Sequence, residues 1–357
     1  MTETITEKKK ISAQVIADSV NPVGNRLTTF VVTFPRIVLA ELNTHRMFSR
    51  NSASSRAIPF EKMLKMVTED PFVPIAWQKD HRGMQGTEYF EDPIGPIEGD
   101  VPMPALQRKG EWLNARAAAV NQAVILSEMG ITKQLCNRLL EPFMWHTAII
   151  TATEWENFFY LRCPDYPLEY TIYESDQVTV KEKGVTHHRS RKDWLAATTD
   201  EYQEQHAPKT EMDWLLFNKG QADIHMMATA EAMWDAKNES KPKELDHNGW
   251  HIPFGDNISA DLSRWEGVID TTEGWGKDLT PLMIKVATAR CARVSYMNFE
   301  GKDDYKADVK LHDMLLNSGH YSPLEHCAKA WPDSTWFGNF RGFQQYRKMI
   351  PGENRVC

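Results

Sequence analysis

The chain has 357 residues, of which 41% are hydrophobic, so it is long enough to bury one large core or two small ones. Its formal net charge of -8 excludes broad binding to nucleic acid polymers, because neutralising phosphates needs a basic field. No run of about 18 apolar residues occurs, and the basic start is not followed by an apolar stretch, so we expect a cytoplasmic protein without a membrane anchor. Five scattered cysteines without a C-x-x-C pair indicate reduced, mostly structural thiols: Cys136, Cys163, Cys291, Cys327 and Cys357.

Secondary structure is predicted from apolar periodicity and from stop signals. Residues 11 to 40 contain two β-branched runs separated by the turn-like NPVGN, and Pro35 closes the second, which predicts two paired strands. Most later elements are predicted helices. They cover residues 36 to near Asn51, Glu111 to Met129 with a stop at Gly130, a start near Thr132, 142 to 161, 222 to 237, 281 to 296, and 308 to 319.

Two segments depart from this pattern. Residues 71 to 105 are rich in proline and glycine and predict an ordered but irregular loop. Residues 163 to 218 are strongly charged, with a short predicted hairpin at YTIYES and QVTVKE, and we interpret them as an insertion with few core positions. Because helices dominate and strands are a minority, we expect the α+β class, with one catalytic domain over residues 1–357 and the insertion inside it.

A first cluster of polar residues is THRMFSRNSASSR, residues 44 to 56, which places His45, Arg46, Arg50 and Arg56 beside several hydroxyl groups. Arginine offers a planar fork of donors to phosphate oxygens, and small hydroxyl side chains fill the remaining acceptor positions. The segment therefore suits phosphate binding. The alternative is a solvated helix end with capping serines, which these residues alone favour slightly.

A second cluster is GHYSPLEH, residues 319 to 326. Ser322 stands where a helix N-cap is expected, with Pro323 at the first helical position and Glu325 at the third, which is a capping box. In the functional alternative, the amide groups of this helix start, together with His320 and His326, face an anionic cofactor. A third group consists of separated polar residues in helical context, usually surface residues: Arg138, Asn157, Arg162, Gln344, Gln345 and Arg347.

Together these segments resemble the flavin-dependent thymidylate synthases, the ThyX family. T-H-R with Ser54 and Arg56 is similar to the family's R-H-R signature and its following Ser and Arg, with Thr44 for the first Arg. The pattern H-x-[ST]-P-x-E-H is matched by residues 320 to 326. The other matches are Arg138 and Pro142 for A-R-x-x-x-P, residues 157 to 162 for N-F-x-x-L-R, residues 221 to 224 for A-Q-x-E-I, and residues 292 to 296, ARVSY.

The chain departs from the family pattern in order and in detail. The S-P-x-E-H segment precedes R-H-R in the family and follows it here, as a circular permutation would produce when the old termini lie close together. Thr44 removes one basic group, and Ser52 stands where the family has the Glu of N-E-x-S. The C-terminal GFQQYRK resembles the Q-x-x-R-H-R approach helix, so either of two segments can contact the substrate. Substrate or product can therefore differ from those of the family.

The resemblance implies the ThyX fold and a homotetramer that binds FAD and a pyrimidine deoxynucleotide where subunits meet, without a metal. It implies that Arg162, His45 and Arg46 are catalytic, with positive charge at His45 and Arg46 favouring the anionic reduced flavin. By the same resemblance, the residues that hold FAD are His45, Arg46, Asn157, Ser295, His320, Ser322, Glu325 and His326. The residues that bind the nucleotide are Ser54, Arg56, Arg138, Arg162, Gln344 and Arg347.

The implied reaction is reductive methylation of dUMP. NADPH reduces FAD, methylenetetrahydrofolate supplies one carbon to C5, and flavin hydride completes the methyl group of dTMP. This chemistry needs no activated thiolate; Cys136 is the only cysteine we would suspect, and a structural thiol is the simpler interpretation. The alternatives are a pyrimidine hydroxymethylase acting on dUMP or dCMP, in which water quenches the adduct, and a non-catalytic nucleotide-binding homologue. A metal hydrolase is poorly supported because His187 and His188 lack clear ligand spacing.

Overall fold

A five-stranded mixed sheet forms the centre of the computed structural model, which describes residues 10–83, 86–91, 103–174, 180–258, 261–268, 278–296 and 304–353. Its strand order is β3-β4-β2-β1-β7, with β1 and β7 parallel and the other neighbours antiparallel. The α+β class and the paired N-terminal strands are confirmed. The strands are β1 Ser12–Val20, β2 Arg26–Pro35, β3 Ser49–Ser52, β4 Trp145–Ala152 and β7 Lys243–Glu244.

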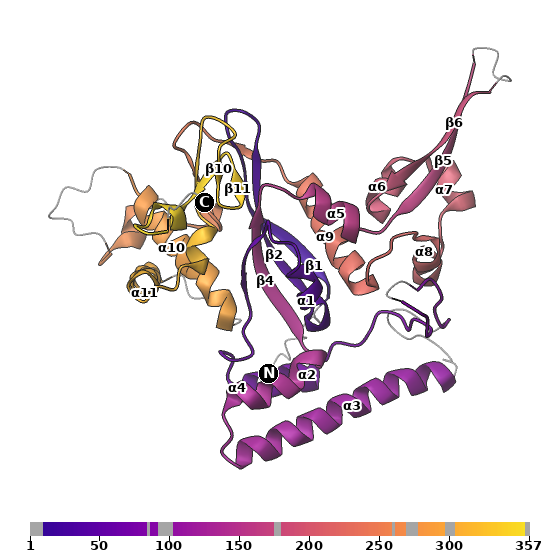
Figure 1. Ribbon diagram of the computed structural model, residues 1–357, viewed down its shortest axis with the longest axis horizontal. Helices are drawn as coiled ribbons and strands as arrows, with labels where there is room; N and C mark the ends of the chain where they lie inside the picture. The colour runs from indigo at the N-terminus through magenta and orange to yellow at the C-terminus, as the bar shows by residue number, and fades with distance from the viewer. Residues whose placement is uncertain are drawn as a thin grey trace.

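Both faces of this sheet are covered. Side chains alternate between the faces along β2 and β4, so each strand sends apolar residues into a separate cluster on each face. On one face Phe30 and Ile150 pack against Met226 of α9 (Ile224–Glu239) and the aromatic residues of α5 (Glu156–Arg162). On the other face Ile149 packs with Cys291, near the end of α10 (Thr280–Arg293), and with Val294, the first residue of η6 (Val294–Tyr296). Figure 1 shows the sheet between α5 and α9 on one side and α10 on the other.

The C-terminal half adds small elements over the second face. A three-stranded sheet has the order β12-β9-β8, and a two-stranded sheet pairs β10 with β11. The elements of this half are β8 Trp250–His251, η3 Gly255–Asn257, η4 Leu262–Trp265, α11 Tyr305–Asn317, η7 Ser322–Glu325, β9 Ala328–Ala330, β10 Trp336–Phe337, β11 Phe340–Arg341, β12 Phe343–Gln345 and η8 Tyr346–Met349.

A buried chain of hydrogen bonds joins the two halves. His251 contacts Ser19 through Nδ1 at 2.9 Å and Thr29 through Nε2 at 2.8 Å. Thr29 and Thr151, partners across β2 and β4, join their hydroxyl groups at 2.8 Å. Thr151 then contacts His326 Nδ1 at 2.7 Å. Burial lowers the pKa of both histidines to about 3, so both rings are neutral and each can donate only one N–H.

Several predicted helices match the structure closely. α4 (Lys133–Cys136) begins after Thr132, whose side chain caps it, and α9, α10 and α11 lie where they were predicted. α3 (Met103–Glu128) ends before Gly130, which has a φ of +82° that favours glycine, but it begins earlier than Glu111. The short α4 continues as η2 (Asn137–Phe143), and α2 (Phe60–Glu69) was not predicted.

The predicted helix from residue 36 to Asn51 is wrong. Only η1 (Arg36–Val38) and α1 (Leu39–Leu42) are helical, and Ser49–Ser52 is the edge strand β3. This strand pairs with β4 in the register Ser49↔Thr151. Serine and asparagine gain little from a helix, so pairing with a neighbouring strand overrides the local periodicity.

The predicted helix from residue 142 to 161 is half wrong. Its TAIITA run is β4, buried between two layers, and only Glu156–Arg162 is helical. β-branched residues lose little side-chain entropy in a strand and pack well on both of its faces. A continuous apolar run is compatible with either element, and burial on both faces decided for the strand.

Residues 163 to 218 contain the predicted hairpin and three helices. β5 pairs with β6 in antiparallel register, which confirms the hairpin. Few of its described residues are buried, as expected, and three of them, Tyr166, Trp194 and Trp214, are buried together in a small core of the segment's own. Its elements are β5 Tyr166–Tyr173, β6 Val180–His188, α6 Arg191–Ala196, α7 Asp200–His206 and α8 Glu211–Phe217, which project to one side in Figure 1.

The predicted irregular loop is partly within the described residues. Residues 71–83 and 86–91 hold only an isolated bridge, Gln78↔Tyr89, as expected for an ordered loop without regular structure. Residues 84, 85 and 92–102 lie outside the described part, and from Met103 the chain is helical. Among the described residues, no helix combines the length and the apolar character that crossing a bilayer requires.

We predict that Thr151→Val destabilises the protein by about 2–4 kcal/mol, because it removes two buried hydrogen bonds and leaves His326 Nδ1 without its partner. Urea denaturation measures the loss. Thr33→Val is the matched control, since Thr33 bonds the Thr147 hydroxyl at 3.1 Å but is only partly buried, and it should cost less than about 1 kcal/mol. Equal losses in the two variants would show that the buried chain contributes nothing special.

A second prediction concerns His146, which is fully buried against Phe34 and whose ring nitrogens have no hydrogen-bond partner among the described residues. Burial, and secondarily Arg36, lower its pKa from 6.5 to about 3. Between these values the unfolded chain takes up the proton and the folded chain does not, so stability falls as the pH falls from 6.5 towards 3. The loss between pH 7 and pH 5 should be about 2 kcal/mol smaller in His146→Leu than in the parent. Exposed His206→Leu is the control and should keep the parent's loss.

Candidate functional site

The residues singled out in the sequence gather around β3 and the turn that precedes it. α5 brings Arg162 to this turn from one side, and η7 packs directly on β3 from the other. The C-terminal strand β12 also reaches it, because Gln345 Nε2 donates to Ser49 Oγ at 3.2 Å. Segments more than a hundred residues apart in sequence therefore share one surface.

Arg162 is the centre of the first group of side chains. Its Nε donates to His45 Nε2 at 3.0 Å, and its Nη1 forms an ion pair with the carboxylate of Glu41. The Arg162 and Glu41 side chains are 21% and 25% exposed, so a ligand can reach both. Burial lowers the pKa of Arg162 from a very high value, and the guanidinium stays charged.

His45 is held as a neutral hydrogen-bond acceptor. Because Nε2 accepts from Arg162, the ring proton resides on Nδ1, and burial together with the nearby Arg50 lowers the pKa of the imidazole. The ring also packs edge-on against Phe158 with centroids 4.9 Å apart. The positive charge near this turn therefore comes from the arginines rather than from His45.

Glu325 pairs with the arginine near the C-terminus, and its charge also acts on the arginine of β3. Arg347 donates from Nη1 to Glu325 at 2.6 Å and from Nε to Glu353 at 2.8 Å. Arg50 donates to the carbonyl oxygens of Leu42 and His45; burial lowers its pKa, and the negative charge of Glu325 opposes that effect. In this structure Arg347 is occupied by two acidic partners, and its predicted contact with a nucleotide stays a prediction.

The Ser-Pro-Leu-Glu segment does not form the expected capping box. η7 is a four-residue 3-10 turn whose N-cap is Tyr321, without a side-chain cap, and Glu325 is paired with Arg347 instead. Residues before it end α11 at Gly319, with a φ of +76°, and leave too little chain for a longer helix. Ser322 is exposed and free of hydrogen bonds within the described part of the chain, so it is available to a ligand.

The two histidines of this segment lie in different environments. His320 is exposed and contacts Ser318 Oγ at 3.0 Å. His326 is fully buried, with Nδ1 on Thr151 and with its Nε2 unpartnered among the described residues. His326 thus holds η7 against the sheet, and contact with a cofactor at the surface would need it to become accessible.

A second basic group lies where the chain leaves β3. Arg56 Nε donates to Gln134 at 3.3 Å, and Lys133 Nζ donates to the carbonyl oxygen of Ala57 at 3.0 Å. Asn137 fixes this turn through its Nδ2, which donates to the carbonyl oxygens of Ser55 and Ile58 at 2.7 and 3.0 Å. The next residue, Arg138, is exposed.

Other predicted residues are placed near these groups. The Ser54 amide donates to the carbonyl oxygen of Ser295 at 3.0 Å, which joins two of the recognised segments across almost the whole chain. Asn157 and Arg46 are exposed. Gln344 lies on β12 opposite Lys329 and is half-buried. No hydrogen bond or ion pair within the described ranges connects the Arg162 group directly to the Arg56 group.

Sequence reasoning missed Glu41. Its signal was the spacing of four residues from His45, which brings an acid and a histidine together on a helical turn. Its pairing with Arg162 had no sequence signal, because the two residues belong to elements separated by the whole of α2, α3 and β4. Asn339, which donates to Ser49 Oγ at 3.2 Å, was missed for the same reason.

The described cysteines are structural. Cys136, Cys163, Cys291 and Cys327 are all buried and free. Burial raises the pKa of Cys327 to about 12 and also raises those of Cys163 and Cys291, so none of the three forms a thiolate near neutral pH. Cys136 donates from Sγ to the carbonyl oxygen of Ile131 at 3.5 Å. Cys357 lies outside the described residues.

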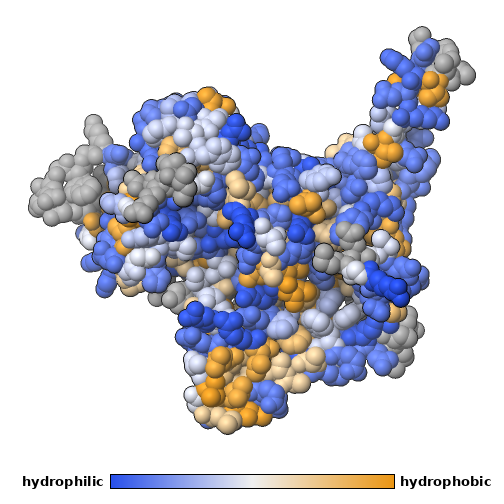
Figure 2. All heavy atoms as spheres, viewed as in Figure 1, coloured by the Kyte–Doolittle hydropathy of each residue, from blue (hydrophilic) through white to orange (hydrophobic). Residues whose placement is uncertain are grey.

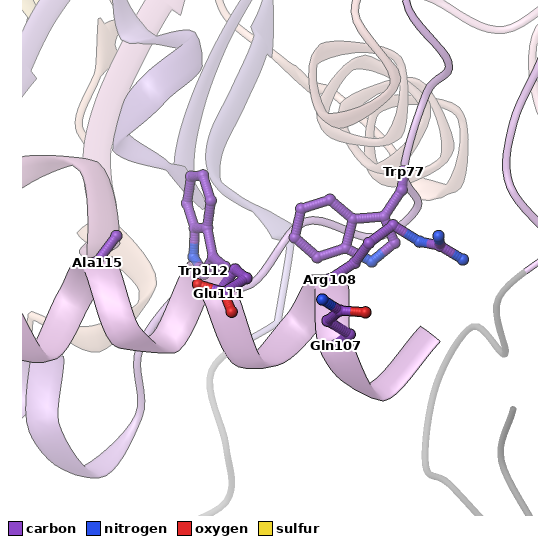
Figure 3. A pocket seen from close by; sticks show the side chains of 6 residues that line it. All are labelled: Trp77, Gln107, Arg108, Glu111, Trp112 and Ala115. Carbon is purple, nitrogen blue, oxygen red and sulfur yellow. The ribbon is translucent and has the colours of Figure 1, made fainter. Parts of the chain in front are cut away.

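A pocket of about 460 Å³ lies elsewhere, between α3 and the loop before it (Figure 3). The indole rings of Trp77 and Trp112 meet there with centroids 6.2 Å apart. Trp112 is fixed by donating to the carbonyl oxygen of Phe72. The lining contains no predicted site residue, so we place the candidate site at β3, where the converging charged groups lie, and not at this cavity. The lining residues are Trp77, Gln107, Arg108, Glu111, Trp112 and Ala115.

Within the described ranges, no three His, Cys, Asp or Glu side chains are arranged to hold a metal ion. The paired histidines of β6 point to other partners, since His187 contacts Asp165 at 2.7 Å and His188 contacts Thr186 at 3.0 Å. These contacts give no support to the metal-hydrolase alternative.

Comparison with known proteins finds remote structural neighbours only. No protein-family model matches the chain, and no curated protein matches it. Two solved structures that match are of the UMP/dUMP methylase PolB from Streptomyces cacaoi, bound with 5-Br UMP and with 5-Br dUMP. Their TM-scores are 0.38 and 0.39, with 13% and 12% sequence identity; each match covers 65% of this chain and 90% or 92% of the PolB chain. A likeness at this level assigns neither a fold family nor an activity.

Proposed function

We propose that this protein is a flavin-dependent enzyme that transfers one carbon from methylenetetrahydrofolate to C5 of dUMP, with NADPH as the reductant. The observation that carries the proposal is that the fold brings the separated T-H-R, N-F-x-x-L-R and S-P-x-E-H segments to one strand, where Arg162 bonds His45 and η7 packs on β3. If the motif matches were accidental, there would be no reason for these segments to contact one another in the fold.

The exposed side chains around β3 fit the flavin that the resemblance implies. The side chains of Arg46, Asn157 and Ser322 are exposed and make no hydrogen bond within the described part, so their donors are available to phosphate and carbonyl oxygens. Behind them His326 keeps a buried, unpartnered Nε2. When bound, reduced FAD would supply the hydride that completes the methyl group.

The residues of the chain supply binding, orientation and charge. Arg46 and Arg50 provide positive charge that would favour an anionic reduced flavin, and neutral His45 accepts the hydrogen bond that orients Arg162. Arg162 polarises a carbonyl of the pyrimidine, so negative charge that develops there is stabilised. Ser54, Arg56 and Arg138 hold the 5′-phosphate, and Lys133, which binds the adjacent turn, adds positive charge beside them.

We further propose that the working unit is a homotetramer in which the Arg162 group of one copy and the Arg56 group of another meet on one nucleotide. A large apolar patch supports association: it covers the end of α3 and α4, in the lower left of Figure 2. The patch adjoins the turn that carries Arg56, because Lys133 of α4 bonds that turn. Its exposed residues are Ile125, Met129, Ile131, Leu135 and Leu139.

The hydroxymethylase remains the second candidate. It is favoured by Thr44, whose hydroxyl is turned back to donate to the carbonyl oxygen of Glu41 at 2.7 Å and so adds no charge to the site. Ser52, at the end of β3, replaces a family carboxylate. With less positive charge, the site would bind the anionic reduced flavin less tightly. The circular permutation stays a prediction, and the assays below address the non-catalytic alternative.

We predict turnover under anaerobic conditions with dUMP, NADPH, FAD and methylenetetrahydrofolate. Mass spectrometry of the nucleotide product separates the candidates: a methyl group supports the synthase, and a hydroxymethyl group supports the second candidate. His45→Ala should lower flavin retention or NADPH oxidation, because it removes the ring that orients Arg162. A colourless protein that cannot be reconstituted with FAD and forms no product would leave only the non-catalytic homologue.

Arg56→Ala should weaken binding of the nucleotide monophosphate by about 1.5–3 kcal/mol, because a charge-assisted hydrogen bond to phosphate is lost, while flavin content stays nearly intact. Calorimetric titration with dUMP measures this. Arg189→Ala is the control, since Arg189 pairs with Glu156 at 3.1 Å and has no contact with the Arg56 group among the described residues. Unchanged affinity in Arg56→Ala would remove the phosphate assignment.

A further inference from the structure

Both side chains of the Glu41–Arg162 pair keep hydrogen-bonding capacity that the described residues do not use. The guanidinium of Arg162 uses Nε for His45 and Nη1 for Glu41, and its Nη2 makes no hydrogen bond within the described ranges. Glu41 uses Oε1 for this ion pair, and its Oε2 accepts no hydrogen bond from the described residues. The two paired side chains therefore still offer unused N–H donors and an unused carboxylate oxygen to a ligand.

The side chains of Arg162 and Glu41 are held in place and are still partly accessible. Arg162 is the last residue of α5, and Glu41 lies on α1, so both side chains project from short helices at the same turn. Their mutual ion pair and the Arg162–His45 bond restrict both side chains. Each is still about a fifth to a quarter exposed, so a planar ligand can reach the unused atoms without breaking the pair.

We propose that Glu41 and Arg162 together read the pairing edge of the pyrimidine and select uracil over cytosine; this inference rests on the function proposed above. Uracil presents a carbonyl oxygen beside its ring N3–H. Arg162 donates to the oxygen and Glu41 accepts from N3–H, so both leftover groups are satisfied at once. Glu41 is then a substrate-binding residue that determines specificity, in addition to its pairing with Arg162.

Cytosine does not match the same edge. Its N3 carries a lone pair, so with Arg162 on the ring carbonyl the Glu41 carboxylate would face another acceptor, and both would lose a hydrogen bond. Cytosine can satisfy both residues only if Arg162 moves to N3 and Glu41 to the exocyclic amine. That shift displaces the ring and, with it, C5. A site that is built to bond a particular N–H rejects analogues lacking it more strongly than a hydrophobic pocket rejects a change in size.

Binding of nucleotides, measured by calorimetry without flavin or folate, tests the inference. The parent should bind dUMP at least about tenfold more tightly than dCMP and than N3-methyl-dUMP, which lacks the N–H. In Glu41→Gln the amide offers a donor as well as an acceptor, so the ratio of dUMP to dCMP affinity should fall to within about threefold. The control is Glu156→Gln on the same α5 helix, which weakens the Arg189–Glu156 pair and should keep the parent's ratio.

Each outcome bears on a different claim. A Glu41→Gln variant that keeps the parent's preference overturns the role of Glu41 while leaving the proposed function intact. Equal binding of dUMP and N3-methyl-dUMP by the parent overturns it as well, and this comparison does not depend on how any variant folds. A parent that binds no pyrimidine nucleotide removes both the inference and the function on which it rests.

Discussion

The buried hydrogen-bond chain through Ser19, His251, Thr29, Thr151 and His326 is the constraint on which the rest of the structure depends. Apolar packing alone would let the C-terminal half slide over the second face of the sheet, because the hydrophobic effect has no direction. A chain of neutral polar groups in a dry interface allows only an arrangement that satisfies its bonds. It therefore sets where η7 meets β3, and with that the place of Glu325.

The arginines at the candidate site fall into a partly buried group and an exposed group. Arg162 and Arg347 are partly buried and each is neutralised by a carboxylate, since a buried charge without a partner is costly. Arg46 and Arg138 are exposed and have no carboxylate partner among the described residues, and Arg56 has only an amide. A protein with a net charge of -8 thus keeps positive charge free around the two ends of β3, where an anionic ligand can use it.

Sequence reasoning succeeded for helices with strong end signals and failed where tertiary pairing competed. Thr132 and Gly130 marked helix ends correctly because caps and glycine act locally. β3 was read as helix because its four residues gain their stability from β4, about a hundred residues later. The same limit applies to the site: His45 and Arg162 were found as motif residues, whereas Glu41, which pairs with Arg162, was not.

Several properties were determined by the sequence alone. They are the α+β class, the N-terminal hairpin, the positions of α9, α10 and α11, and the set of polar residues from which the site is built, because each follows from periodicity, end signals or local residue type. Only the tertiary structure decided that TAIITA is a strand, that His45 is neutral, and that Glu41 meets Arg162. Burial, proton position and ion pairing depend on which distant segments come into contact, and local residue preferences do not specify those contacts.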